Sequence, residues 1–172
     1  MKQNRNRRLA RVYAFQNLYA AEFHKGEESI EIPMDEFPAL DLAFAQAIIE
    51  GTTEHKSAID DILQSHSPKR KIAHLGAVER NVLRMATWEL IFAEEKIDGR
   101  IIINEAIQLT KEYGADNSYK FVNAVLDSIK QSALKADTAK AEAVKSEVEK
   151  TEASKSELTK TNMAEVKTNI EA

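Results

Sequence analysis

The chain has 172 residues, a formal net charge of −4 and no cysteine. This length suits one domain with a sizeable core, and the lack of cysteine excludes a disulfide framework and a thiolate metal site and favours a reducing compartment. No apolar run approaches the roughly 18 residues that span a bilayer, so we expect a cytoplasmic protein with no membrane partner.

Hydrophobic periodicity predicts helices along most of the chain, because apolar residues recur at steps of three and four. The predicted helices cover about 6–24, 39–65, 77–95 and 101–113, and a fifth starts within 113–125. Gly51 weakens the expectation of one continuous second helix. Two stretches, 25–38 and 65–76, have the composition of connectors. No segment alternates in the manner of a strand, so the predicted fold class is all-α.

The first eleven residues form a basic end. They carry five basic side chains and no acid, which leaves −9 for the rest of a chain whose total is −4. A small cationic pole on an acidic body directs a polyanion to one end of the molecule. On a helix, Arg8, Arg11 and Phe15 share a side, where arginine can hold phosphate and an aromatic ring can stack on an unpaired base. The plainer interpretation is a solvated helix end.

A second candidate surface is the stretch "YGADNSYKFVNAV". Gly114 is expected to take the positive-φ position that ends a helix, and Asn117 or Ser118 is expected to cap the next one. Tyr119 and Lys120 lie off the apolar stripe in the first turn of that helix, where unpaired amides attract anions. The plainer interpretation is a turn and a cap.

The sequence offers no catalytic constellation. The four histidines have no metal-ligand spacing, and neighbouring acids on a helix point about 100° apart. The five glycines are isolated, so they form no phosphate-binding loop, and no serine lies in a nucleophile motif. We therefore expect a binding protein that is not an enzyme and uses neither a metal nor a cofactor.

The composition changes after about residue 133. Lysine and glutamate recur there at intervals of about five residues, a step that advances about 500° around a helix and forms no apolar face. The predicted organisation is therefore one helical domain, residues 1–134, and a low-complexity tail, residues 135–172, that is disordered or only weakly and transiently helical.

Four motifs in the same chain resemble the bacterial NusB transcription antitermination family. They are "RRLARVYAFQNLY", "GAVERNVLRMATWEL", "INEAIQLTKEYG" and "SYKFVNAVLD", in the family's order and within about residues 5–130. Two positions depart from the family pattern: Trp88 replaces its usual tyrosine, and Gly99 stands where a helix-starting proline is common. The tail lies outside the pattern.

The resemblance implies an all-α fold of two small helical bundles and no enzymatic activity. It implies binding of single-stranded boxA-type RNA from ribosomal RNA operon leaders, as a heterodimer with NusE, a protein of the small ribosomal subunit, within the RNA polymerase antitermination complex. The two candidate surfaces would then form one groove between the bundles. Carried over by motif, the RNA contacts are Arg7, Arg8, Tyr19, Glu79, Arg84, Asn117, Lys120 and Phe121.

Two alternatives remain open. One is a NusB-like RNA-binding module of the kind fused to RNA cytosine methyltransferases, which without a catalytic domain serves only to recruit. The other is a protein-interaction adaptor whose basic end docks an acidic partner. Titration with single-stranded RNA at several salt concentrations separates the adaptor from the RNA binder, because phosphate contacts make affinity salt-dependent.

Overall fold

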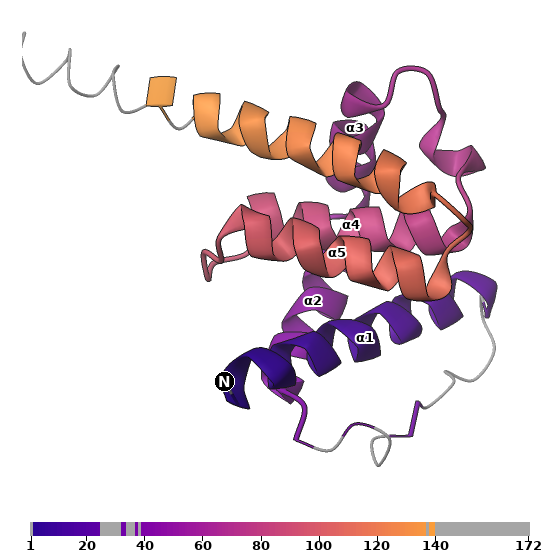
Figure 1. The fold of residues 1–172 in the computed structure, drawn as a ribbon, viewed down its shortest axis with the longest axis vertical. Helices are drawn as coiled ribbons and strands as arrows, with labels where there is room; N and C mark the ends of the chain where they lie inside the picture. Colours follow the sequence, from indigo (N-terminus) through magenta and orange to yellow (C-terminus); the bar gives the residue numbers. More distant parts are fainter. Residues whose placement is uncertain (1, 25–31, 34–36, 38, 137, 140–172) are drawn as a thin grey trace, which may run out of the picture. The chain divides into compact units, whose positions relative to one another are not determined.

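A computed structural model describes residues 2–24, 32–33, 37, 39–136 and 138–139 of the chain (Figure 1). The chain divides into two compact units, residues 1–131 and 132–172. The connector 25–38 and the tail 135–172 lie mostly outside the described residues. The few described tail positions, 135, 136, 138 and 139, are helical, and the predicted disorder of the tail stays a prediction.

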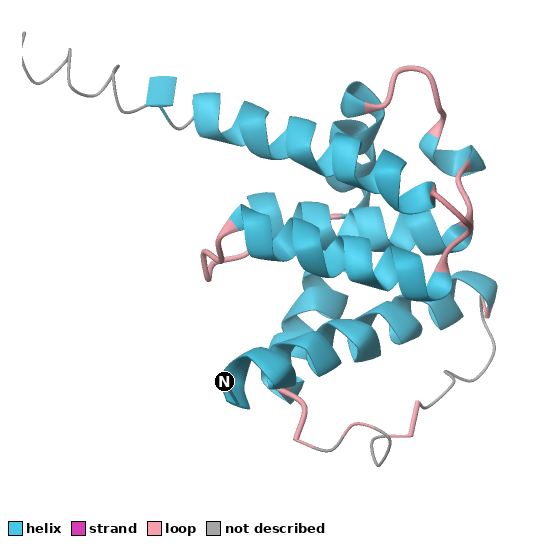
Figure 2. Cartoon of the chain, in the orientation of Figure 1, coloured by secondary structure: helices cyan, strands magenta, loops and turns pink. Residues whose placement is uncertain are grey.

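The described residues form helices and connecting turns, with no strand among them, which confirms the all-α fold class (Figure 2). None of these helices is long and apolar enough to cross a bilayer. In chain order, the described helices begin with α1 (Lys2–Phe23), α2 (Leu42–Glu54), α3 (Lys56–His66), a short 3₁₀ helix (Ile72–His74), α4 (Ala77–Ile91) and α5 (Gly99–Tyr113). A final helix begins at residue 118 and continues to residue 136.

The predicted second helix is two helices, and the break is not at Gly51. It lies at His55, which ends α2 and precedes α3. Gly51 is buried inside α2, where an added Cβ would overlap the indole ring of Trp88. Glycine is therefore required because α2 approaches α4 closely at this point. Trp88, which stands where the NusB family usually carries tyrosine, fills the space that Gly51 leaves open.

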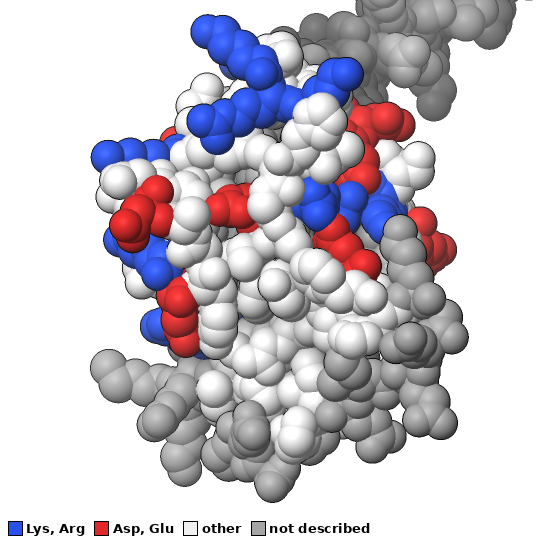
Figure 3. Space-filling model, turned by 90° about the vertical axis from the view of Figure 1, so that its right-hand side faces the viewer, with Lys and Arg blue, Asp and Glu red and all other residues white. Residues whose placement is uncertain are grey.

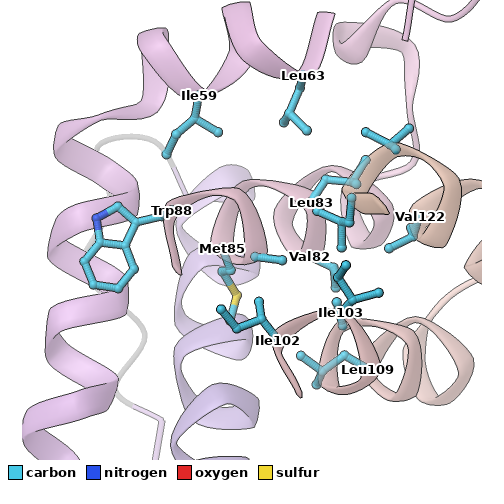
Figure 4. Close-up of a cluster of buried hydrophobic side chains, with 14 of the residues drawn as sticks. Ile59, Leu63, Val82, Leu83, Met85, Trp88, Ile102, Ile103, Leu109 and Val122 are labelled. Carbon is cyan, nitrogen blue, oxygen red and sulfur yellow. The ribbon is translucent and has the colours of Figure 1, made fainter. Parts of the chain in front are cut away.

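Helix α4 joins the two bundles. It contacts α1, α2, α3 and α5, while α1 packs mainly on α2 (Figure 1). Every residue from Asn81 to Glu89 is buried, because neighbours surround this helix. The core brings together side chains of α3, α4, α5 and the final helix (Figure 4): Ile59, Leu63, Val82, Leu83, Met85, Ile102, Ile103, Leu109 and Val122.

The start of α5 explains the second departure from the family pattern. Gly99 is the first residue of the helix, and the Asp98 carboxylate accepts a hydrogen bond from the Arg100 amide at 2.8 Å. The Arg100 guanidinium, together with this amide, lowers the pKa of Asp98 to about 2. The cap at Asp98 therefore fixes the helix start without the proline that is common there.

Candidate nucleic-acid interface

A cavity of about 790 Å³ opens on the side of the first unit that faces the viewer in Figure 3. Lys and Arg side chains gather across the upper part of this face. The walls come from the C-terminal ends of α1 and α5, the start of α4, the segment 67–76 and the first turn of the final helix. The side chains that line it include Tyr19, Lys69, Arg70, Lys71, His74, Glu79, Tyr113 and Phe121.

The basic segment, residues 67–76, supplies the positive charge of this cavity. Lys69, Arg70 and Lys71 are all exposed, and within the described part of the chain none of them forms an ion pair. Their charges are therefore available to a ligand. The prediction placed only a connector here and assigned it no function. The run of three cations after Pro68 was the signal that could have identified it.

Hydrogen bonds hold the basic segment in one conformation. The Ser67 hydroxyl donates to the Arg70 carbonyl at 3.1 Å, and the Gln64 side chain donates to the Ser67 carbonyl at 3.0 Å. At the other end, the Arg80 guanidinium donates to the carbonyls of Ala73 and Leu75, at 3.2 and 2.6 Å. The three cations are thus mounted on a backbone that α3 and α4 fix.

Aromatic rings line the other walls. Tyr19 and Tyr113 are each 36% exposed, and Phe121 is half-buried. The Arg70 guanidinium lies over the Phe121 ring, 4.8 Å from its centre. This cation–π contact connects the basic segment to the final helix. Exposed ring faces next to cations are the combination that single-stranded nucleic acids use, because bases stack and phosphates pair with cations.

Glu79 lies in the first turn of α4 and lines the same cavity. Its carboxylate folds back over Gly76, where an added Cβ would overlap one of its oxygens. The glycine therefore makes room for this carboxylate at the start of the helix. A carboxylate among cations can accept a hydrogen bond from the amino group of a base.

The turn before the final helix differs from its prediction. Gly114 has φ −94° and ψ 177°, an extended conformation, so the expected positive φ was wrong. The left-handed residue is Asn117, with φ 64°. Gly114 is needed for space, since a Cβ there would lie 2.6 Å from the Thr110 carbonyl oxygen. The Ser118 hydroxyl donates to the Ala115 carbonyl, and Asn117 and the nearby Lys120 are exposed.

The basic end of α1 does not present the arginine surface that its sequence predicts. Arg11 is 3% exposed and bonds to Glu89 through two nitrogens, with distances of 2.6–3.1 Å. Arg7 bonds to both oxygens of Glu95, at 2.7 and 2.8 Å, and these bonds raise the pKa of Arg7. Only Arg8 is exposed among the three. The side chains of residues 2–5 lie outside the described part.

Arg84 is also held by an acid. It is buried, and its guanidinium makes two bonds of 2.8 Å to the Asp60 carboxylate, which join α4 to α3. It lines a different cavity of about 510 Å³, next to Glu22 and Arg80. Arg7 lines a third cavity, of about 560 Å³, beside Trp88.

The structure thus divides the eight predicted contacts among several places. Three line the 790 Å³ cavity, namely Tyr19, Glu79 and Phe121. Asn117 and Lys120 lie in the turn and first helical turn beside Phe121, Arg8 is exposed on α1, and Arg7 and Arg84 are in the other two cavities. The described residues contain no cluster of three His, Asp or Glu side chains that could hold a metal ion.

Comparisons with known proteins are consistent across sequence and structure. The model of the NusB family matches residues 8–131. A transcription antitermination protein NusB from Desulfitobacterium hafniense is 38% identical over 138 residues, which cover 77% of this chain and 93% of that protein. The structure is similar to Thermotoga maritima NusB, with a TM-score of 0.63 and 37% identity over 72% of this chain and 89% of that one.

A second structural relative is a crystal structure of antitermination factors NusB and NusE in complex with dsRNA. Its TM-score is 0.60 at 30% identity, and the match covers 74% of this chain and 98% of that one.

Proposed function

The chain belongs to the NusB family of transcription antitermination factors, and we propose that it binds single-stranded boxA-type RNA from ribosomal RNA operon leaders together with NusE. Like its family, it is a binding protein and not an enzyme. The observation that carries this proposal is the cavity in which Lys69, Arg70 and Lys71 face Tyr19 and Phe121.

The cavity has complementary parts for the two halves of a nucleotide. Lys69 and Lys71 are exposed cations on a fixed backbone, suited to successive phosphates. Tyr19 and Phe121 offer ring faces to unpaired bases, since base–aromatic stacking needs no particular base. Glu79 accepts from a base amino group. A duplex hides its base faces, so this arrangement favours a single strand over a double helix.

The remaining predicted residues take different roles in this proposal. Lys120 and Arg8 are exposed and contact phosphates of the strand that leaves the cavity, and Asn117 lies beside that path. Arg7 and Arg84 are engaged by Glu95 and Asp60. Their proposed contribution is to hold the helices that carry the interface.

The partners follow from the family. The structural relative that contains both NusB and NusE with RNA supports a joint complex for this chain as well. We propose that this complex joins RNA polymerase-associated factors and suppresses premature termination. The alternative function is that of a recruiting or adaptor module for another protein. Such a module would have the same NusB-like surface but would not need boxA-type RNA.

The test is a titration of the full chain against boxA-type single-stranded RNA, a scrambled strand of equal composition and a duplex, at several salt concentrations, with and without NusE. We expect the boxA-type strand to bind most tightly, with an affinity that falls as salt rises and increases when NusE is added. Equal affinity for the scrambled strand would contradict boxA recognition. Binding of NusE without any salt-dependent RNA binding would favour the adaptor.

A further inference from the structure

A small slot of about 260 Å³ adjoins the RNA cavity and has no role in the account above. Its lining residues are Phe15, Gln16, Tyr19, Val78 and Tyr113. Three of them, Tyr19, Val78 and Tyr113, also line the larger cavity. The slot is therefore continuous with the proposed path of the RNA, at the point where the C-terminal ends of α1 and α5 meet.

Three aromatic rings shape the slot. Phe15 is 3% exposed, while Tyr19 and Tyr113 are each 36% exposed. The Phe15 ring centre is 5.8 Å from that of Tyr19 and 5.2 Å from that of Tyr113. Phe15 and Tyr19 are four residues apart and share a face of α1. Flat rings beside an open space provide stacking surfaces for a flat ligand.

Gln16 supplies the polar edge of the slot. Its side chain is half-buried and lines the slot together with Tyr113. A glutamine amide has two N–H donors and one carbonyl acceptor. One N–H and the carbonyl can therefore pair with an acceptor and a donor that are neighbours on a ligand.

We propose that this slot takes one unpaired nucleobase of the bound RNA, stacked against Tyr19 and Tyr113, with the Gln16 amide pairing with its hydrogen-bonding edge. The inference rests on the proposed RNA-binding function and names the part of the site that reads base identity. Cations and ring faces accept every nucleotide, whereas an amide distinguishes bases by the order of their donors and acceptors. The slot thus adds specificity to a site that is otherwise tolerant.

The experiment uses the full chain and a boxA-type RNA series in which each position in turn is abasic. For the wild-type chain, we expect one position at which losing the base costs about 5- to 150-fold in affinity, the range of base–aromatic stacking. Tyr113→Ala should lose a similar factor for intact RNA, yet bind the RNA that is abasic at that position as the wild type does. Phe23→Ala is the matched control, since this exposed ring stacks on Tyr19 outside the slot.

A second variant tests the edge without removing a ring. In Gln16→Ala, loss of the base at that position should still weaken RNA binding as much as in the wild type. The difference in affinity among the four bases at that position should mostly disappear. Helix content and thermal unfolding of each variant identify any change in fold. If Tyr113→Ala weakens intact and abasic RNA equally, or Gln16→Ala leaves the base preference unchanged, no base occupies the slot. If the wild type binds none of these RNAs with salt-dependent affinity, the proposed function itself fails.

Discussion

Two arginine- and lysine-rich regions lie within residues 1–131, and the fold uses them differently. At the start of α1, Arg7 and Arg11 are paired with Glu95 and Glu89. In the basic segment 67–76, three cations remain exposed, and one of them lies over the Phe121 ring. Among the described side chains, the basic end of α1 therefore leaves one exposed cation, Arg8, whereas the basic segment leaves three. Charge counts along a chain do not reveal the acids that the fold brings beside them.

The largest expected effect is on stability, and it concerns Arg11, the buried arginine of the basic end. Arg11→Met leaves the Glu89 carboxylate buried without its partner, which should lower the free energy of unfolding by about 3–5 kcal/mol at neutral pH. Burial raises the pKa of Glu89 above its ordinary 4.5, and removing Arg11 takes away the hydrogen bonds and the charge that oppose this effect most strongly. The folded variant then takes up a proton as pH falls, so its deficit relative to the wild type should shrink towards pH 4.5.

Denaturant unfolding between pH 7 and 4.5 measures this deficit. The control is the double variant Arg11→Met with Glu89→Gln, which carries no charge at either position, so its stability should lack the gain on acidification that Arg11→Met shows. A deficit below 1 kcal/mol for Arg11→Met, together with a large loss of RNA affinity, would instead make Arg11 a binding residue and remove the contrast between the two regions.

The second prediction concerns the basic segment. Replacing Lys69 and Lys71 by glutamine removes two phosphate contacts, so the slope of log affinity against log salt should weaken by about 1.4, at about 0.7 per contact for a single strand. At 0.1 M salt this corresponds to about 25-fold weaker binding. The matched control is Lys96→Gln with Arg100→Gln, which removes the same charge at the far end of α5 and should leave the slope unchanged. If both pairs of substitutions weaken the slope equally, the change comes from a general loss of positive charge and not from lost contacts in the cavity.

The third prediction returns to α1. A charge count predicts that replacing Arg7 and Arg8 by glutamine costs two contacts, whereas the structure leaves only Arg8 free. The slope should therefore weaken by about 0.7, with about fivefold weaker binding at 0.1 M salt. A change of 1.4 in the same titration would mean that Arg7 leaves Glu95 to bind RNA, and the two basic regions would then act alike.

The smallest effect is expected for the third lysine-rich stretch, residues 135–172. It contains seven lysines and eight acids, a net charge of −1, so its lysines should add little attraction for RNA. Deleting it should change the free energy of unfolding by less than about 0.5 kcal/mol and RNA affinity by less than about twofold. A clear drop in melting temperature would show that the tail packs on the domain, and a large loss of affinity would show that it binds RNA.

Local patterns predicted the helices well because the apolar period depends on neighbours three and four residues away. The positions at which helices break and turns form depended on more distant residues. Gly51 suggested a helix break, but its role is set by Trp88 on α4, and the break is at His55. Gly114 suggested a left-handed turn, but Asn117 takes that conformation.

The candidate site, too, was predicted only where the information lies in local sequence motifs. The family motifs named Tyr19, Glu79 and Phe121, which are far apart in the sequence and line one cavity. The pairing of Arg11 with Glu89, 78 residues away, could not be inferred from the residues around either one. The segment 67–76 has a visible run of cations, but only the fold shows that they face the aromatic walls of the cavity.

The most direct test of the account is a lysine-acetylation footprint of the full chain, measured by mass spectrometry with and without saturating boxA-type RNA. Lys69, Lys71 and Lys120 are exposed beside or around the cavity, whereas Lys56 and Lys96 are exposed elsewhere. We predict that RNA protects the first three and leaves the other two as reactive as in the free protein. Protection of Lys56 or Lys96, with Lys69 and Lys71 unaffected, would place the RNA on another face and contradict the central claim.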